Sequence, residues 1–184
     1  AASAVKQIAK SGKKILFVAT KKQAKEIVST HVRKVGMPFV TERWPGGMLT
    51  NFATIRKAVR KMASIDKMST TDTYKALSKR ERLQIQRERA KLEKQLGSIA
   101  DLNRLPSALF VVDINKEHIA VAEARKLNIP TFAIVDTNTD PKKVDFPIPA
   151  NDDASKSIEL ITRIITKAIE EGLVERKLDR DKSA

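Results

Sequence analysis

The segment Lys14-Ile15-Leu16-Phe17-Val18-Ala19 decides the fold class, because a short, continuous apolar run is typical of a strand buried on both faces of a parallel sheet. The same pattern recurs at residues 108–113 and 131–136. Residues 38–41 form a weaker strand candidate. The prolines of residues 145–149 fit only a short edge strand. The sequence therefore predicts a mostly buried parallel sheet.

Amphipathic segments alternate with these runs. Residues 1–11, 23–35, 116–127 and 154–171 follow helical spacing, and a glycine comes directly after three of them. Strands and helices that alternate along a chain indicate an α/β fold, in which helices flank a parallel sheet.

Residues 52–99 interrupt this alternation. Apolar residues recur at helical spacing from Phe52 to Ile65, and a polar turn follows at 69–73. Ser78 and Glu81 then form a capping-box pattern, behind which apolar residues recur every seven positions. We expect an antiparallel coiled-coil helical hairpin. It is inserted into a sheet domain made of residues 1–51 and 100–174, and a charged tail occupies 175–184.

Composition excludes several classes of protein. The 184 residues contain no cysteine, so disulfides and thiolate metal sites are absent. No apolar run approaches the roughly 20 residues that span a bilayer, and the first residues lack the apolar stretch of a secretory signal. We expect a protein of a reducing, soluble compartment with no membrane partner.

Positive charge is concentrated in the first half of the chain. The net charge is +14 in total: +8 for residues 1–55, +8 for 56–96 and −2 for 97–184. Such asymmetry favours a surface that binds a polyanion, because lysine and arginine displace counterions from phosphates. A solvated basic surface without a partner is the alternative.

The loop that follows the first strand predicts phosphate binding without nucleotide specificity. It has no glycine to approach a pyrophosphate, and a Walker sequence is absent, but Lys21 and Lys22 stand at the start of a helix. Several aspartates lie at or after the ends of the predicted strands, and we expect them to form turns and helix caps, with a cation site as the alternative. They are Asp113, Asp136, Asp140, Asp152 and Asp153. The two histidines lie at neither metal-ligand nor triad spacing, so we expect no catalysis, metal or cofactor.

Residues 41–52 form the most unusual stretch. Pro45-Gly46-Gly47 predicts a tight loop, flanked by Arg43 and by Trp44, the only tryptophan. An arginine and an aromatic ring beside exposed backbone can clamp a phosphate and stack on a base. Burial of Trp44 in the core is the alternative. Thr50 or Asn51 is the expected helix cap, beside backbone N–H groups that would donate hydrogen bonds to an anion.

Four sequence blocks resemble the small-subunit ribosomal protein S2 family in its bacterial or organellar form. They are residues 43–52, 105–113, 128–141 and 148–154, and Ala150 stands where the family often has glycine. The resemblance implies a three-layer, flavodoxin- or Rossmann-like sheet with a protruding hairpin. It also implies a missing N-terminal segment, since family members usually begin earlier.

The same resemblance implies a structural, non-enzymatic role in the cytoplasmic small ribosomal subunit. Expected partners are ribosomal RNA and neighbouring ribosomal proteins, including the messenger-binding protein S1. The expected RNA-contacting residues are Lys21, Lys22, Arg43, Trp44, Gly46, Gly47, Thr50, Asn51, Arg56, Lys57, Arg60, Lys61, Arg80, Arg82, Arg87 and Arg89. A nucleotide- or flavin-binding enzyme and a protein-interaction module near an anionic membrane are the rival interpretations.

Overall fold

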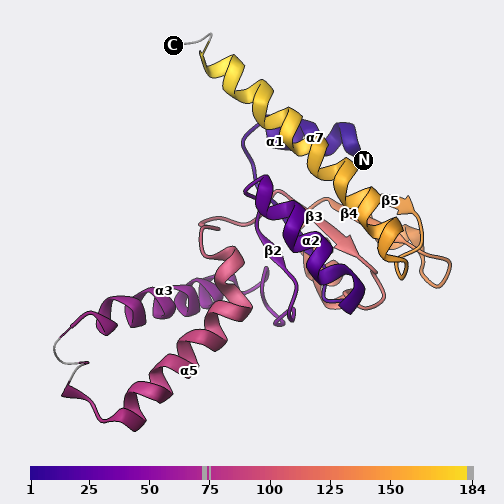
Figure 1. Cartoon of the computed structure of the whole chain (residues 1–184). Coiled ribbons are helices and arrows are strands. Elements are labelled where there is room, and N and C mark those ends of the chain that lie inside the picture. Colours follow the sequence, from indigo (N-terminus) through magenta and orange to yellow (C-terminus); the bar gives the residue numbers. More distant parts are fainter. Residues whose placement is uncertain (72–73, 75, 182–184) are drawn as a thin grey trace.

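The computed structural model describes residues 1–71, 74 and 76–181, so Asp72, Thr73 and residues 182–184 of the predicted turn and tail lie outside the described residues. Five parallel strands form one sheet in the order β2-β1-β3-β4-β5 (Figure 1). The strands are β1 Ile15–Val18, β2 Phe39–Val40, β3 Ala108–Val112, β4 Thr131–Val135 and β5 Phe146–Pro149. This order is that of flavodoxin-like folds, which confirms the predicted α/β class.

Helices cover both faces of the sheet, and two short 3₁₀ turns join elements. The helices are α1 Ala2–Lys10, α2 Lys22–Lys34, α3 Phe52–Ser69, α5 Lys79–Leu96, α6 His118–Lys126 and α7 Ser155–Asp181, and the 3₁₀ turns are Gly97–Ile99 and Pro141–Lys143. Helices α1, α2 and α7 share one core with Phe17, Phe110 and Phe132. Helix α6 and the inner ends of α3 and α5 share the other core with Leu16 and Leu109.

Both edges of the sheet are short. Strand β2 has two residues, while β5 carries Pro147 and Pro149, as expected for an edge strand. The ring of Phe146 on β5 stacks on that of Phe132 with centroids 4.4 Å apart.

Helices α3 and α5 extend away from the sheet and run in opposite directions (Figure 1). Helix α5 begins with the predicted capping box, in which the Ser78 side chain accepts a bond from the Glu81 backbone. Ion pairs join the two helices, between Lys61 and Glu88 and between Arg89 and Asp66. The inserted helical pair is therefore present, while coiled-coil packing of its apolar seam stays a prediction.

Helix α7 is longer than the sequence pattern predicts. It does not end at residue 171 but continues through Gly172 to Asp181, so most of the predicted tail is helical. Gly172 is a contact point instead of a helix stop: a Cβ there would lie 2.5 Å from the Lys6 carbonyl oxygen of α1. No described helix has the length and apolarity needed to cross a membrane.

Replacing Gly172→Ala should destabilise the fold by about 1–2 kcal/mol, since overpacking costs roughly 1–3 kcal/mol and alanine returns part of this through helix propensity. Thermal or denaturant unfolding measures the effect. Gly46→Ala is the matched control, because a Cβ at Gly46 meets nothing within 4 Å. Equal stability of the two variants would contradict the close α1–α7 approach.

Candidate nucleic-acid interface

The loop between β2 and α3 wraps around one buried carboxylate, Glu123 of α6. Its Oε1 accepts bonds from the Trp44 indole N–H at 3.1 Å and from the Gly47 backbone at 2.7 Å. Its Oε2 accepts from the Leu49 and Thr50 backbones at 2.9 and 3.0 Å and from the Thr50 hydroxyl at 3.1 Å. Five donors from one loop thus converge on a single side chain.

Glu123 binds this loop in its ionised form. Burial alone would raise the pKa of the Glu123 carboxyl, but the hydrogen bonds from Thr50, Leu49, Trp44 and Gly47 outweigh burial, and the pKa lies below its ordinary value. The loop is therefore an anion site whose anion is part of the protein.

This arrangement corrects the expected role of the loop. The backbone N–H groups expected to receive a phosphate already bind Glu123, and Trp44 is only 7% exposed, so it is not available to stack on a base. Gly47 has a φ of +84°, which suits glycine and explains its place in the turn. Arg43, Gly46 and Asn51 remain at the surface.

Lys21 also forms ion pairs within the protein. Its Nζ lies 2.7 Å from Asp152, 2.6 Å from Asp153 and 3.2 Å from Asp113, and its side chain is 13% exposed. Burial alone would lower the pKa of Lys21, but these carboxylates raise it above its ordinary value. We therefore leave Lys21 out of the interface, whereas its neighbour Lys22 is exposed.

The same ionic cluster fills the carboxyl edge of the sheet between β1 and β3, where open parallel sheets usually bind ligands. Thr20 donates its backbone N–H at 2.8 Å and its hydroxyl to Glu117. Asp152 donates its backbone N–H to Asp136 at 3.3 Å. Ionic groups of the protein itself, Lys21 and its aspartates, thus occupy the position where a nucleotide would sit, although Oδ2 of Asp152 is buried without a hydrogen-bond partner among the described residues.

Two of the aspartates, Asp113 and Asp140, also form the turns that the sequence predicts. Asp113 accepts from the Asn115 and Lys116 backbones at 3.0 Å, and Asp140 accepts from Lys142 at 2.9 Å, so both stabilise turns. Within the described part of the chain, no group of three or more histidine and acidic residues could hold a metal ion.

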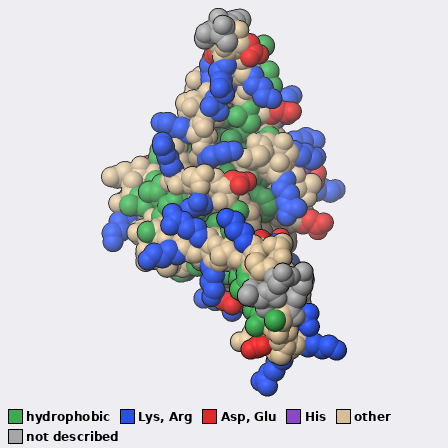
Figure 2. Space-filling view, turned by 90° about the vertical axis from the view of Figure 1, so that its left-hand side faces the viewer, with side chains coloured by type: hydrophobic (Ala, Val, Ile, Leu, Met, Phe, Trp, Pro, Cys, Tyr) green, Lys and Arg blue, Asp and Glu red, His purple; other side chains and the backbone are tan. Residues whose placement is uncertain are grey.

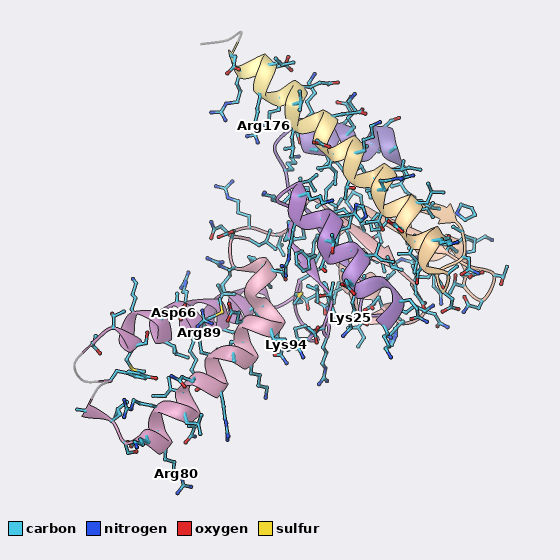
Figure 3. All side chains as sticks on the ribbon, viewed as in Figure 1. Lys25, Asp66, Arg80, Arg89, Lys94 and Arg176 are labelled. Atoms are coloured by element: carbon cyan, nitrogen blue, oxygen red, sulfur yellow. The ribbon has the colours of Figure 1, made fainter. Side chains whose placement is uncertain are left out.

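The cations of the helical pair divide into engaged and unpaired groups. Arg56 donates to the carbonyls of Ala100 and Leu102 at 2.9 and 3.1 Å. Lys61 and Arg89 form the ion pairs that join α3 to α5, and Figure 3 shows Arg89 beside Asp66. Arg82 is half-buried. Four expected contact residues are exposed without an ion pair to any described residue: Lys57, Arg60, Arg80 and Arg87.

One carboxylate ties the helical pair to the sheet domain. Glu42, which follows β2, lies 3.6 Å from Lys25 of α2 and 3.4 Å from Lys94 of α5. Figure 3 shows Lys25 and Lys94 on either side of this junction, whereas Arg80 points away at the far end of α5. The exposed cations therefore extend from an anchored base to a distant tip.

Sequence analysis missed Glu123 and the Lys21 cluster. A signal for Glu123 did exist, since one acidic residue lies between Ala120 and Ala124 on the apolar face of its helix. Lys21 gave no local signal, because its partners come from distant segments of the chain.

Comparison with known proteins gives a consistent result. The profile of the family described as Ribosomal protein S2 matches residues 1–172. The small ribosomal subunit protein uS2 of Phocaeicola vulgatus is 69% identical over 180 residues, which cover 98% of this chain and 64% of that relative. The uS2 protein of Flavobacterium johnsoniae is 65% identical over 181 residues, covering 98% of this chain and 71% of the relative.

A third relative, uS2 of Porphyromonas gingivalis, is 67% identical over 180 residues, covering 98% of this chain and 64% of its own length. The chain thus spans slightly less than two thirds of two of these three relatives.

Glu123→Gln should cost about 2 kcal/mol of stability near neutral pH, since hydrogen bonds to a charged group are lost or weakened. Because the folded-state pKa of Glu123 is lowered, its contribution is complete above the ordinary carboxyl pKa of about 4.3 and is lost as pH falls through the lowered value. Unfolding curves should therefore converge for wild type and variant in acid. The exposed Glu26→Gln is the control, and a pH-independent gap would contradict this account.

Lys21→Gln should destabilise the protein by about 3 kcal/mol at pH 7, because it leaves buried carboxylates unpaired. Burial raises the pKa of Asp152, so the loss should shrink as acid neutralises that carboxyl. Denaturant titration at several pH values measures this, with the exposed Lys22→Gln as control. If both variants have wild-type stability, Lys21 does not organise the edge.

Proposed function

The chain belongs to the ribosomal protein S2 family, and from this premise we propose that it is a structural, RNA-binding component of the small ribosomal subunit. The single observation that carries RNA binding is the charge distribution, because residues 1–96 hold a net +16 while the rest of the chain is slightly acidic. A polyphosphate scaffold is the partner that such a charge suits best.

The exposed cations supply the contacts in this proposal. They come from the start of α2, from the loop after β2 and from the helical pair, and they are Lys22, Arg43, Lys57, Arg60, Arg80 and Arg87. Arginine fits phosphate bidentately, and structured RNA presents phosphates and 2′-hydroxyls more readily than base edges. Binding then depends on the shape and charge of the RNA rather than on its sequence.

The charges that bind other parts of the protein have a supporting role. Glu123 shapes the loop that carries Arg43, while Arg56 fixes the base of the helical pair. These groups hold the exposed cations in place, and the exposed cations contact the phosphates of the RNA. The filled carboxyl edge of the sheet supports a binding protein over an enzyme.

Other partners follow from the family. We propose that neighbouring ribosomal proteins contact the neutral-to-acidic second half of the chain, and that S1 is among them. We propose that the protein acts in the small ribosomal subunit in the cytoplasm; its relatives are named small ribosomal subunit proteins.

Charge reversal tests the RNA contacts. Arg43→Glu, Lys57→Glu and Arg60→Glu together should weaken binding to a small-subunit ribosomal RNA transcript. They should also reduce the slope of log affinity against log salt by about 2–3, since each phosphate contact contributes roughly 0.7–0.9. Fluorescence anisotropy at several salt concentrations measures both quantities.

The control reverses three exposed cations of α7, Lys156, Arg163 and Lys167, and so changes the charge by the same amount. Wild-type affinity that does not change with salt would refute the phosphate contacts. An equal loss in test and control variants would show that net charge, and no defined surface, drives binding.

A further inference from the structure

A groove of about 360 Å³ lies between the C-terminal ends of α2 and α7. Lys34 of α2 lines it on one side, and Arg176, Lys177 and Arg180 line it from α7. Leu173 and Val174 supply apolar lining, and Glu170 is the one acidic lining residue. None of these cations was among the residues expected to contact RNA.

The sequence of α7 sorts its charges onto two sides. Glu171, Glu175 and Asp179 recur every four residues, so they form one stripe along the helix. Lys6 and Lys10 of α1 pair with this stripe at distances from 2.7 to 3.4 Å. Two lysines of α1 thus pair with all three carboxylates of this stripe.

The basic residues of the same turns have no such partners. Lys34, Arg176, Lys177 and Arg180 make no ion pair with any residue that the structure describes. Arg176 and Arg180 are four residues apart, and like charges at this spacing repel on a helix. An anion in the groove would relieve that repulsion.

Helix dipoles explain only part of the cluster. Cations in the last turn of a helix are favourable, which accounts for Lys34 on α2 and Arg180 on α7. Arg176 and Lys177 lie before the last turn of α7. The dipole of α7 therefore does not account for these two residues, which line the groove together with Lys34.

Positive charge continues beyond the groove. The guanidinium of Arg176 lies over Gly12, where an added Cβ would come within 2.3 Å of its carbon, so the groove adjoins the turn that carries Lys13 and Lys14. Lys14 donates to the Gly36 carbonyl at 2.6 Å, just beyond α2. Figure 2 shows lysine and arginine side chains gathered over the face that extends from the end of α7 to the helical pair.

We infer that this groove is a second RNA-backbone site, separate from the helical pair and built by α2 and α7. Arg176 and Arg180 are about 6 Å apart along the helix axis, so they can contact neighbouring phosphates of one strand. Arginine forks match phosphate oxygens, and the apolar lining admits a ribose or base. The inference rests on the proposed function, since the RNA bound there is the RNA of the subunit.

Neutralising the α7 cations tests the site. Arg176→Gln, Lys177→Gln and Arg180→Gln together should lower the affinity for the small-subunit ribosomal RNA transcript about tenfold at low salt and reduce the salt slope by about 2. The control changes Lys156, Arg163 and Lys167 of the same helix to glutamine and should retain affinity and slope. Melting curves verify the fold of each variant.

A charge-conserving variant keeps the test valid if the triple variant does not fold. Arg176→Lys with Arg180→Lys should keep the salt slope near that of wild type, while the single variant Lys34→Gln should lower it by about 1. A lowered affinity for the groove variant combined with unchanged affinity for the control supports the site.

Three outcomes would overturn the inference. Wild-type affinity and slope in the groove variant, when reversal of Arg43, Lys57 and Arg60 still weakens binding, would remove this site and leave the proposed function intact. Selective loss of binding to polyglutamate, or to phosphatidylserine vesicles, with unchanged RNA affinity would assign the groove to an acidic polypeptide or a membrane. Absence of RNA binding by the wild-type chain would instead remove the proposed function and, with it, the site.

Discussion

The carboxylate of Glu123 is the constraint on which the rest of the surface depends. It collects five hydrogen bonds from one loop, including the indole N–H of Trp44. That loop begins after the edge strand β2 and leads directly into α3. Because Glu123 belongs to α6, packed on the sheet, the start of the helical pair is fixed relative to the core. The exposed Arg43 gains its position from the same bonds.

The sheet follows the plan of many ligand-binding enzymes, yet its carboxyl edge is filled by the protein itself. Lys21 and its three aspartates occupy the point between β1 and β3 where the order of the strands in the sheet reverses. A cation from the first half of the chain thus neutralises carboxylates from the second half. At the edge where a ligand would bind, this pairing instead connects distant segments of the chain.

Local sequence predicted the elements well because their signals are local. Apolar runs gave the buried strands, and the Ser78 capping box marked the start of α5. The end of α7 was not predictable in this way, since Gly172 allows close packing against α1, which is more than 160 residues away along the chain. Glu123 and Lys21 were missed for the same reason. Their partners come from remote segments of the chain. The local sequence around a lysine at the start of a helix is the same whether the lysine binds a phosphate of a ligand or a carboxylate of the protein itself.

The prolines of β5 have a consequence for what the sheet can recruit. Ala150 donates its backbone N–H to Val135 of β4, so every second residue of this stretch directs its nitrogen inward. Pro147 and Pro149 fall on the alternate positions, where the nitrogen faces outward and carries no hydrogen. A strand approaching from solvent finds no donors at either position. The open edge at β5 is therefore protected against pairing with a strand of another chain.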